Sequence, residues 1–176
     1  MQKPVIFTIG HSNRSIDEFI GLLQVHGIET LIDVRTMPRS RHNPQFNLDA
    51  LPQSLQPVRI QHVHMANLGG LRHAKKDSIN LGWRNASFRG YADYMSSAEF
   101  EIGLAELMQT ARNKTTAIMC AEAVPWRCHR SLIADALIKK GWLVRDIMSR
   151  TKAVRHTLTP FLKIRNGQLG YPRPKS

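Results

Sequence analysis

The chain has 176 residues, of which 42% are hydrophobic and 22% charged, a composition typical of a soluble globular protein with one hydrophobic core. It has no apolar run long enough to cross a membrane, no signal-peptide layout and only two cysteines, so we expect a cytoplasmic protein without a disulfide framework. The formal net charge of +12, from 25 Lys and Arg against 13 Asp and Glu, indicates anionic partners, among which nucleic acid is the most usual.

The N-terminal part of the chain predicts a βαβ unit. Residues 5–9 are apolar and β-branched, as in a buried strand. Ser15 and Glu18 form a capping box that begins a helix, and Gly27 ends it. Residues 30–35 then predict a second strand. A strand, a helix and a strand with short connections are expected to form a right-handed, parallel unit.

Two long irregular stretches follow, at residues 36–57 and 67–84, and loops of this length are commonly functional. Between them, residues 59–65 predict a third strand. Residues 87–91 predict the start of a short helix, and a second capping box beginning at Ser96 predicts an amphipathic helix after it.

The C-terminal part predicts two more strands and a hairpin. Residues 115–120 form the fourth predicted strand, a helix follows Cys128, and residues 142–147 form the fifth strand. Residues 161–171 predict a hairpin that turns at Asn166 and the glycine after it, the favoured type I′ pair.

Together these elements predict a single α/β domain over residues 1–176, three-layered and Rossmann-like, with a mainly parallel sheet and a C-terminal β-hairpin. In a parallel sheet the carboxyl ends of the strands meet at one edge, where ligands bind. Four groups of side chains should therefore approach one another: His11, Asp33 with Arg35, His64, and the segment 120–130. An internal salt bridge between Asp33 and Arg35 is the alternative to a role in binding.

The segment Cys120-Ala-Glu-Ala-Val-Pro-Trp-Arg-Cys128-His-Arg130 is the most informative part of the chain. His129 and Arg130 fall in the first turn of a predicted helix, where cationic side chains and free backbone N–H groups favour an anion. Glu122 is the strongest acid–base candidate at the strand exit, unless it only pairs with a neighbouring arginine.

The same segment leaves two readings of its cysteines open. Cys120 lies near cations and a helix N-terminus, which favour a reactive thiolate, but a cysteine at the end of a buried strand is often inert. The loop also lacks the glycines of a phosphate-transfer cysteine loop. Cys120, Cys128 and His129, with His11 or His64, offer zinc-type donors, although the Cys-x7-Cys-His spacing matches no standard zinc finger.

Several motifs of the chain occur together in one known family. They are Thr8-Ile-Gly-His-Ser12, Asp33-Val-Arg35, Leu68-Gly-Gly70, Phe88-Arg-Gly-Tyr91, Cys120-Ala-Glu122, Cys128-His-Arg130 and His156-Thr-Leu-Thr-Pro-Phe161. With them the chain resembles, over nearly its whole length, the bacterial and archaeal domain-of-unknown-function family numbered 488. The resemblance implies a single α/β domain and assigns no activity, substrate or cofactor. Its motif positions fall on His11, Arg35, Arg89, Tyr91, Cys120, Glu122, Cys128, His129 and Arg130.

We therefore expect a domain that binds an anionic, phosphate-bearing ligand, either a nucleotide or nucleic acid, at the strand carboxyl ends, with no membrane and no cofactor. The expected ligand-binding residues are Arg35, Arg89, Tyr91, Cys128, His129 and Arg130. Glu122, His11 and Cys120 are the catalytic candidates if the protein is a hydrolase or transferase that uses acid–base chemistry. Two alternatives stay open: a non-catalytic nucleic-acid-binding module that uses the basic loops 36–43 and 72–76, and a zinc or thiol redox site.

Overall fold

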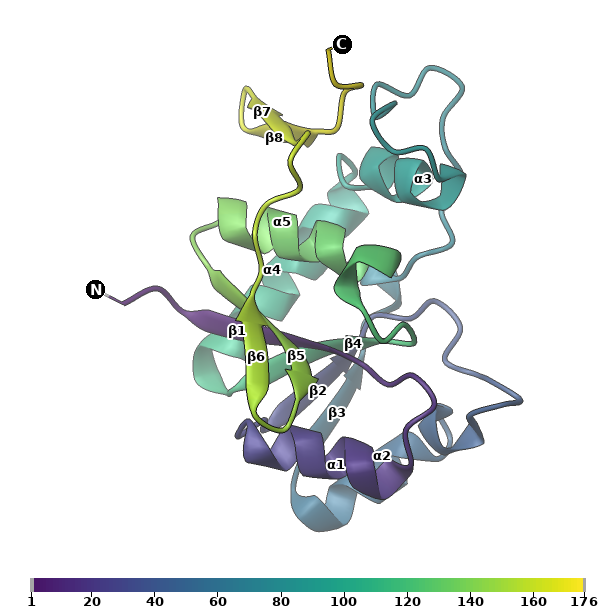
Figure 1. The fold of residues 1–176 in the computed structure, drawn as a ribbon, viewed down its shortest axis with the longest axis vertical. Helices are drawn as coiled ribbons and strands as arrows, with labels where there is room; N and C mark the ends of the chain where they lie inside the picture. Colours follow the sequence, from purple (N-terminus) through teal and green to yellow (C-terminus); the bar gives the residue numbers. More distant parts are fainter. Residues whose placement is uncertain (1, 176) are drawn as a thin grey trace.

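A six-stranded sheet with the strand order β3-β2-β4-β1-β5-β6 lies in the middle of the molecule (Figure 1). The computed structural model describes residues 2–175. The strands are β1 (Val5–Gly10), β2 (Thr30–Asp33), β3 (Gln61–His64), β4 (Thr116–Cys120), β5 (Leu143–Ser149) and β6 (Lys152–Arg155). β1 to β5 are parallel and β6 pairs antiparallel with β5 at one edge, so the predicted mainly parallel sheet is confirmed.

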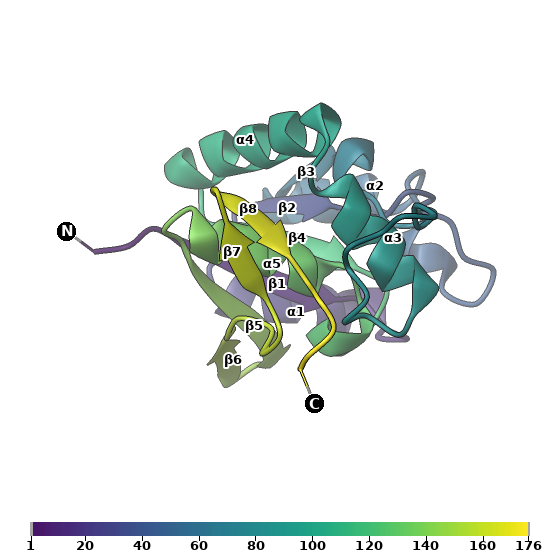
Figure 2. The same ribbon diagram turned by 90° about the horizontal axis from the view of Figure 1, so that it is seen from above.

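Helices cover both faces of this sheet and produce three layers (Figures 1 and 2). One face carries α1 (Ile16–Val25) and the short α2 (Leu51–Leu55), and the other carries α3 (Ala86–Tyr94), α4 (Ala98–Asn113) and α5 (Arg130–Lys139). Side chains that alternate along each strand supply the two cores. In β4, Ile118 packs toward α4 and α5, while Ala117 and Met119 pack toward α1. The predicted three-layer architecture is therefore confirmed.

The predicted start of α1 is confirmed, whereas that of α4 is wrong by one residue. The Ser15 hydroxyl accepts a hydrogen bond from the Glu18 backbone N–H at 3.1 Å. Ser97, and not Ser96, caps α4 by accepting from the Phe100 N–H at 3.2 Å. The Ser96 hydroxyl instead donates to the Asp93 carbonyl at 2.9 Å, so it belongs to the C-terminal end of α3 and does not cap α4.

Two further parts of the chain differ in how well the sequence predicts them. The hairpin of β7 (Lys163–Arg165) and β8 (Gln168–Gly170) is confirmed, and Asn166 and Gly167 have φ values of 51° and 76°, as a type I′ turn requires. The edge strand β6 was not predicted, because its mostly exposed residues lack the apolar pattern of a buried strand. Helix α2 was likewise not predicted within the irregular stretch 36–57.

The predicted meeting of the strand ends is confirmed by the register of the sheet. β4 lies between β1 and β2, with Cys120 opposite Gly10 and Met119 opposite Asp33. The loop after β4 passes directly over Gly10, where an added Cβ would lie 1.5 Å from the Glu122 carbonyl oxygen. In residues 2–175, no helix is long and apolar enough to span a membrane.

Candidate functional site

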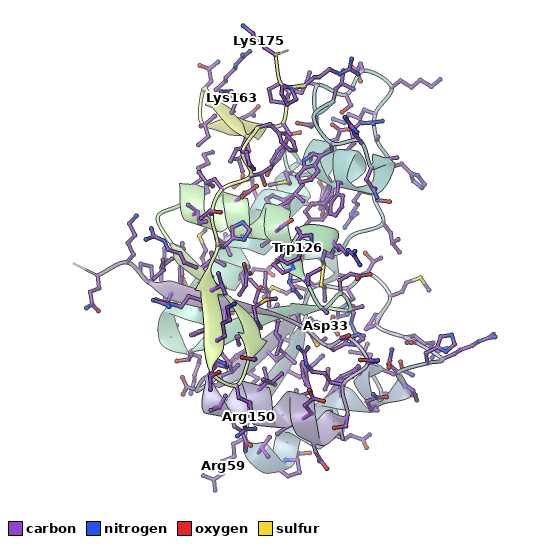
Figure 3. The ribbon with its side chains drawn as sticks, in the orientation of Figure 1. Asp33, Arg59, Trp126, Arg150, Lys163 and Lys175 are labelled. Carbon is purple, nitrogen blue, oxygen red and sulfur yellow. A yellow bond between two sulfur atoms is a disulfide. The ribbon has the colours of Figure 1, made fainter. Side chains whose placement is uncertain are left out.

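A pocket of about 440 Å³ opens where β2 and β4 end. Its walls come from the segments that follow these two strands, from Gly70 and Leu71, and from the beginning of α3. Five of the predicted site residues line it: Arg35, Cys120, Glu122, Cys128 and His129. Figure 3 shows Asp33 at the end of its strand, and Trp126 on the loop that follows β4.

Arg35 is held in place at the pocket wall by several partners. Its Nε donates to Asp33 Oδ1 at 2.8 Å, and its Nη2 donates to Asp33 Oδ2 and to the Phe46 carbonyl, both at 2.6 Å. The internal salt bridge considered from the sequence is thus present. Its Nη1 lies 3.2 Å from His11 Nε2, so one of the five guanidinium N–H groups has no partner among the described residues. Burial opposes ionisation of Asp33. The hydrogen bonds and the charge of Arg35, together with the nearby His62, outweigh this effect and lower the Asp33 pKa below its ordinary value of 3.8.

His11 supports Arg35 and does not line the pocket. Burial is the main cause that lowers the His11 pKa to about 4, so the ring is neutral at neutral pH. In this neutral ring Nδ1 donates to the Ser12 carbonyl at 2.7 Å, which leaves Nε2 to accept from Arg35. The ring also stacks on Phe46 with 4.3 Å between the ring centroids. Both ring nitrogens are therefore used inside the protein, and a catalytic role of His11 stays a prediction.

Cys120 and Cys128 both line the pocket, and they form a disulfide with each other. This disulfide corrects the expectation from the sequence that the two cysteines form none. It arises because a turn of 3-10 helix at Pro125–Arg127 folds the loop back toward the end of β4 before α5 begins. The Cα atoms of the two cysteines are 7.2 Å apart.

Arg130 holds the loop after β4 from below. Its side chain is fully buried, and its guanidinium donates to the Glu122 and Ala123 carbonyls at 2.9 and 3.1 Å and to Cys120 Sγ at 3.3 Å. Burial lowers the pKa of Arg130 to about 10, so the group stays charged at neutral pH. The predicted contact of Arg130 with a ligand stays a prediction, because in this structure the guanidinium faces the loop and does not line the pocket.

His129 lines the pocket as a neutral ring, with Tyr91 behind it. The His129 Nε2 donates to the Val34 carbonyl at 2.8 Å, and burial is the main cause that lowers its pKa to about 4. The Tyr91 ring lies 4.8 Å from the imidazole, centroid to centroid, and its hydroxyl donates to the Leu68 carbonyl at 2.8 Å. Tyr91 is 1% exposed and does not line the pocket, so it packs against His129 from the interior of the protein.

The remaining charged candidates divide between the pocket and the outer surface. Arg89 donates to the Trp83 carbonyl at 3.1 Å, which closes the turn before α3, and it does not line the pocket. Glu122 lines the pocket with an exposed side chain. Arg127 does the same and was missed as a site residue, although it lies in the segment singled out from the sequence. Arg127 lies in the loop before α5, where no sequence pattern distinguishes a cation that faces a pocket from one that faces solvent.

The described part of the chain holds no group of three or more His, Cys, Asp and Glu side chains that could bind a metal ion. The geometry therefore does not support the zinc alternative. The basic loops 36–43 and 72–76 carry exposed Arg39, Arg41 and Lys75 and adjoin the pocket walls. Cations also lie far from the pocket, with Arg59 and Arg150 at one end of the molecule and Lys163 and Lys175 at the other (Figure 3).

A second polar cluster, which the sequence does not predict, connects the C-terminal segment to the sheet. His156 lies between two buried carboxylates, with its Nε2 3.2 Å from Asp135 Oδ1 and its Nδ1 3.2 Å from Asp146 Oδ2. Burial opposes protonation, but hydrogen bonds to both carboxylates and their charges outweigh it and raise the His156 pKa to about 9. The Tyr171 hydroxyl donates to Asp135 at 2.8 Å. This cluster uses its polar groups internally.

The fold and site define a class of protein: a parallel α/β protein with a polar pocket at the carboxyl ends of its strands and a cysteine pair in the pocket wall. The chain belongs to the family described as Domain of unknown function DUF488, whose model matches residues 15–137. The match includes Arg35 and the segment 120–130, and it leaves out His11 and His156. No curated protein and no solved structure matches the chain.

Proposed function

We propose that the protein binds a small anionic, phosphate-bearing ligand in the pocket at the ends of β2 and β4. The observation that carries this proposal is the position of Arg35, which lines the pocket and keeps one N–H without a partner among the described residues, while Asp33, His11 and Phe46 fix its guanidinium. An arginine that is already fixed loses little conformational entropy when it binds an anion, and its planar fork suits phosphate oxygens.

Arg127 supplies a second positive charge to the same pocket. Its side chain is exposed and donates no hydrogen bond to a described residue, so its donors are free for a ligand. Ala121 and Glu122 also line the pocket, and their backbone N–H groups donate no hydrogen bond to another group within residues 2–175. Backbone amides of this kind commonly bind phosphate at the end of a parallel strand.

The other walls favour a nucleotide within this ligand class. Phe88, Met37 and Leu71 provide an apolar surface on which a base can pack, and Asn85 and Ser87 provide polar groups beside it. The volume of about 440 Å³ falls in the range of roughly 300–1,000 Å³ that is usual for small-molecule sites.

Glu122 is the group through which this site would act as a hydrolase or transferase. Its exposed carboxylate lines the pocket beside Arg127 and is free to take a proton from a bound ligand or water. Glu122→Gln keeps the size of the side chain and removes the base. A catalytic role predicts that this variant binds nucleotide as the wild type does and loses turnover.

Calorimetric titration with pyrophosphate and with adenosine triphosphate tests the binding proposal. Arg127→Ala should weaken both ligands by about tenfold or more, the effect of losing a charge-assisted contact. Arg112→Ala removes an equal charge from an exposed position on α4 and should leave both affinities unchanged. Equal affinities of the two variants, or no binding by the wild type, would refute the proposal.

A non-catalytic nucleic-acid-binding module is the second candidate, favoured by the exposed cations Arg39, Arg41, Lys75 and Lys76 on the two loops beside the pocket. Binding of single-stranded RNA through these loops predicts a steep loss of affinity with salt. Arg39→Ala with Arg41→Ala should reduce the salt slope by about 1.4, roughly 0.7 per lost phosphate contact on a single strand. An unchanged slope would contradict this second candidate.

A further inference from the structure

Both cysteines of the chain lie in the wall of the ligand pocket. Cys120 ends β4 and Cys128 precedes α5. Both residues line the pocket and are nearly buried, Cys120 with 2% and Cys128 with 6% of its surface exposed. Their disulfide closes the loop that connects β4 to α5. We propose that Cys120 and Cys128 are a redox-active dithiol that exchanges with a small anionic disulfide bound in this pocket.

The surroundings of both sulfurs favour the thiolate, which is the reactive form of cysteine. The Arg130 guanidinium places Nη1 3.3 Å from Cys120 Sγ, and its charge is fully buried. The Arg130 backbone N–H points at Cys128 Sγ from 3.5 Å, at the beginning of the ten-residue helix α5. A nearby cation and a helix N-terminus are the two features that most often activate a thiol. One arginine therefore serves both sulfurs.

His129 distinguishes the two cysteines. Because its Nε2–H donates to the Val34 carbonyl, Nδ1 carries the lone pair of the neutral ring and lies 3.6 Å from Cys128 Sγ. The Cys128 thiol can donate to this nitrogen, whereas the Cys120 sulfur has only the Glu122 carbonyl, 3.8 Å away, and Arg130 as partners. We assign Cys128 as the attacking thiol and Cys120 as the thiol that resolves the intermediate.

The exchange is balanced without any further reactant. The Cys128 thiolate attacks one sulfur of the small disulfide, breaks its S–S bond and releases one thiolate. The Cys120 thiolate then attacks Cys128 Sγ in the mixed disulfide and releases the second thiolate. The protein dithiol is oxidised by two electrons, the small disulfide is reduced to two thiols, and the protons of the two cysteines pass to the released thiolates.

The charge of the pocket indicates the class of disulfide. Arg35 and Arg127 line it together with the sulfurs, so carboxylates near the S–S bond would be bound as in a charge-assisted pair. Glutathione disulfide has this chemistry and is the probe of choice. The exchange needs only the two sulfurs and access through the pocket, so it does not rest on phosphate binding.

The test treats the reduced full chain with glutathione disulfide and follows the intact mass. The wild type should form the intramolecular disulfide, and an excess of reduced glutathione should reverse it. Cys120→Ser should stop at a mixed disulfide on Cys128. Cys128→Ser should react with glutathione disulfide at least about tenfold more slowly than the wild type. Circular dichroism shows whether both variants are folded. Retention of both thiols by the wild type, or exchange only in urea, would overturn the proposal.

An uncharged disulfide separates the thiol chemistry from the recognition of charge. Arg127→Ala should slow the reaction with glutathione disulfide several-fold more than that with bis(2-hydroxyethyl) disulfide, and Arg112→Ala should slow neither. If Arg127→Ala slowed the reactions with both disulfides equally, the anionic substrate class would be contradicted. Selective exchange without any binding of pyrophosphate would remove the proposed phosphate function and leave this inference intact.

Discussion

Asp33 and Arg35, two residues apart in the chain, form a doubly hydrogen-bonded ion pair at the end of β2, with Nε–Oδ1 and Nη2–Oδ2 distances of 2.8 and 2.6 Å. Asp33 is fully buried and Arg35 is 8% exposed, so neither charge is solvated well enough to remain without the other. The pair fixes the guanidinium at the pocket wall. It therefore links the stability of the fold to the anion binding that we propose for the site.

Removing the charge of Asp33 should therefore destabilise the protein strongly. Asp33→Asn leaves the buried Arg35 without its counter-charge, and we expect the free energy of unfolding to fall by about 3–5 kcal/mol. Urea denaturation measures this loss. Asp77→Asn, at an exposed loop position, should change the free energy of unfolding by less than about 0.5 kcal/mol. A loss as small for Asp33→Asn would contradict the importance of the pair.

Gly10 is required where the loop after β4 crosses β1. In Gly10→Ala the new methyl group would lie 1.5 Å from the Glu122 carbonyl oxygen and 2.6 Å from Arg130 Nη1, so the loop must move. We expect a loss of about 1–3 kcal/mol in stability together with weaker pyrophosphate binding, both measurable on the purified variant. Gly170→Ala is the matched control, because its methyl group would meet only the Lys163 carbonyl oxygen at 3.9 Å. Wild-type affinity of Gly10→Ala would contradict this role.

Stability should fall at alkaline pH because of His156. Its pKa is raised from 6.5 in the unfolded chain to about 9 in the folded protein, so the folded state binds the proton more tightly. The resulting stabilisation, on the order of 3 kcal/mol, is complete below pH 6.5 and is lost as the pH rises toward 9 and above. Urea denaturation across this range should show the loss in the wild type and not in His156→Gln. A flat profile for the wild type would refute the prediction.

Stability should also fall in mild acid, because of His129 and His11. Both pKa values are lowered from 6.5 to about 4 in the folded protein, so between these limits the unfolded chain binds more protons than the folded one. The free energy of unfolding should decrease as the pH falls from 6.5 toward 4. His129→Gln should make this decrease shallower. An identical acid profile for His129→Gln and the wild type would show that the His129 ring is not held neutral.

The elements that the sequence predicts correctly are those with strong local patterns. The Ser15 cap, the apolar runs of β1 and β4 and the Asn166 turn each depend on residues that are close together in the chain. The adjacency of the strand ends also follows, because a parallel sheet brings them to one edge. The edge strand β6 has too little burial to leave such a pattern.

The polar side chains of the site are harder to predict, because their partners are set by the tertiary structure. A sequence shows that Arg130 is cationic at a helix start, but not that the Glu122 and Ala123 carbonyls use its donors. The same holds for His11, whose ring nitrogens are taken by Ser12 and Arg35. Arg127 could have been found only by treating every cation of the segment 120–130 as a candidate.

A two-dimensional ¹H–¹⁵N NMR titration of the full chain with pyrophosphate tests the binding pocket most directly. Binding in the pocket predicts saturable shifts for the amides of Ala121, Glu122 and Arg127 and for the Arg35 side chain, because these four residues line the pocket. Amides of the exposed loop residues Arg41 and Lys76 should shift little. Shifts confined to these loops, or a spectrum that pyrophosphate leaves unchanged, would contradict it.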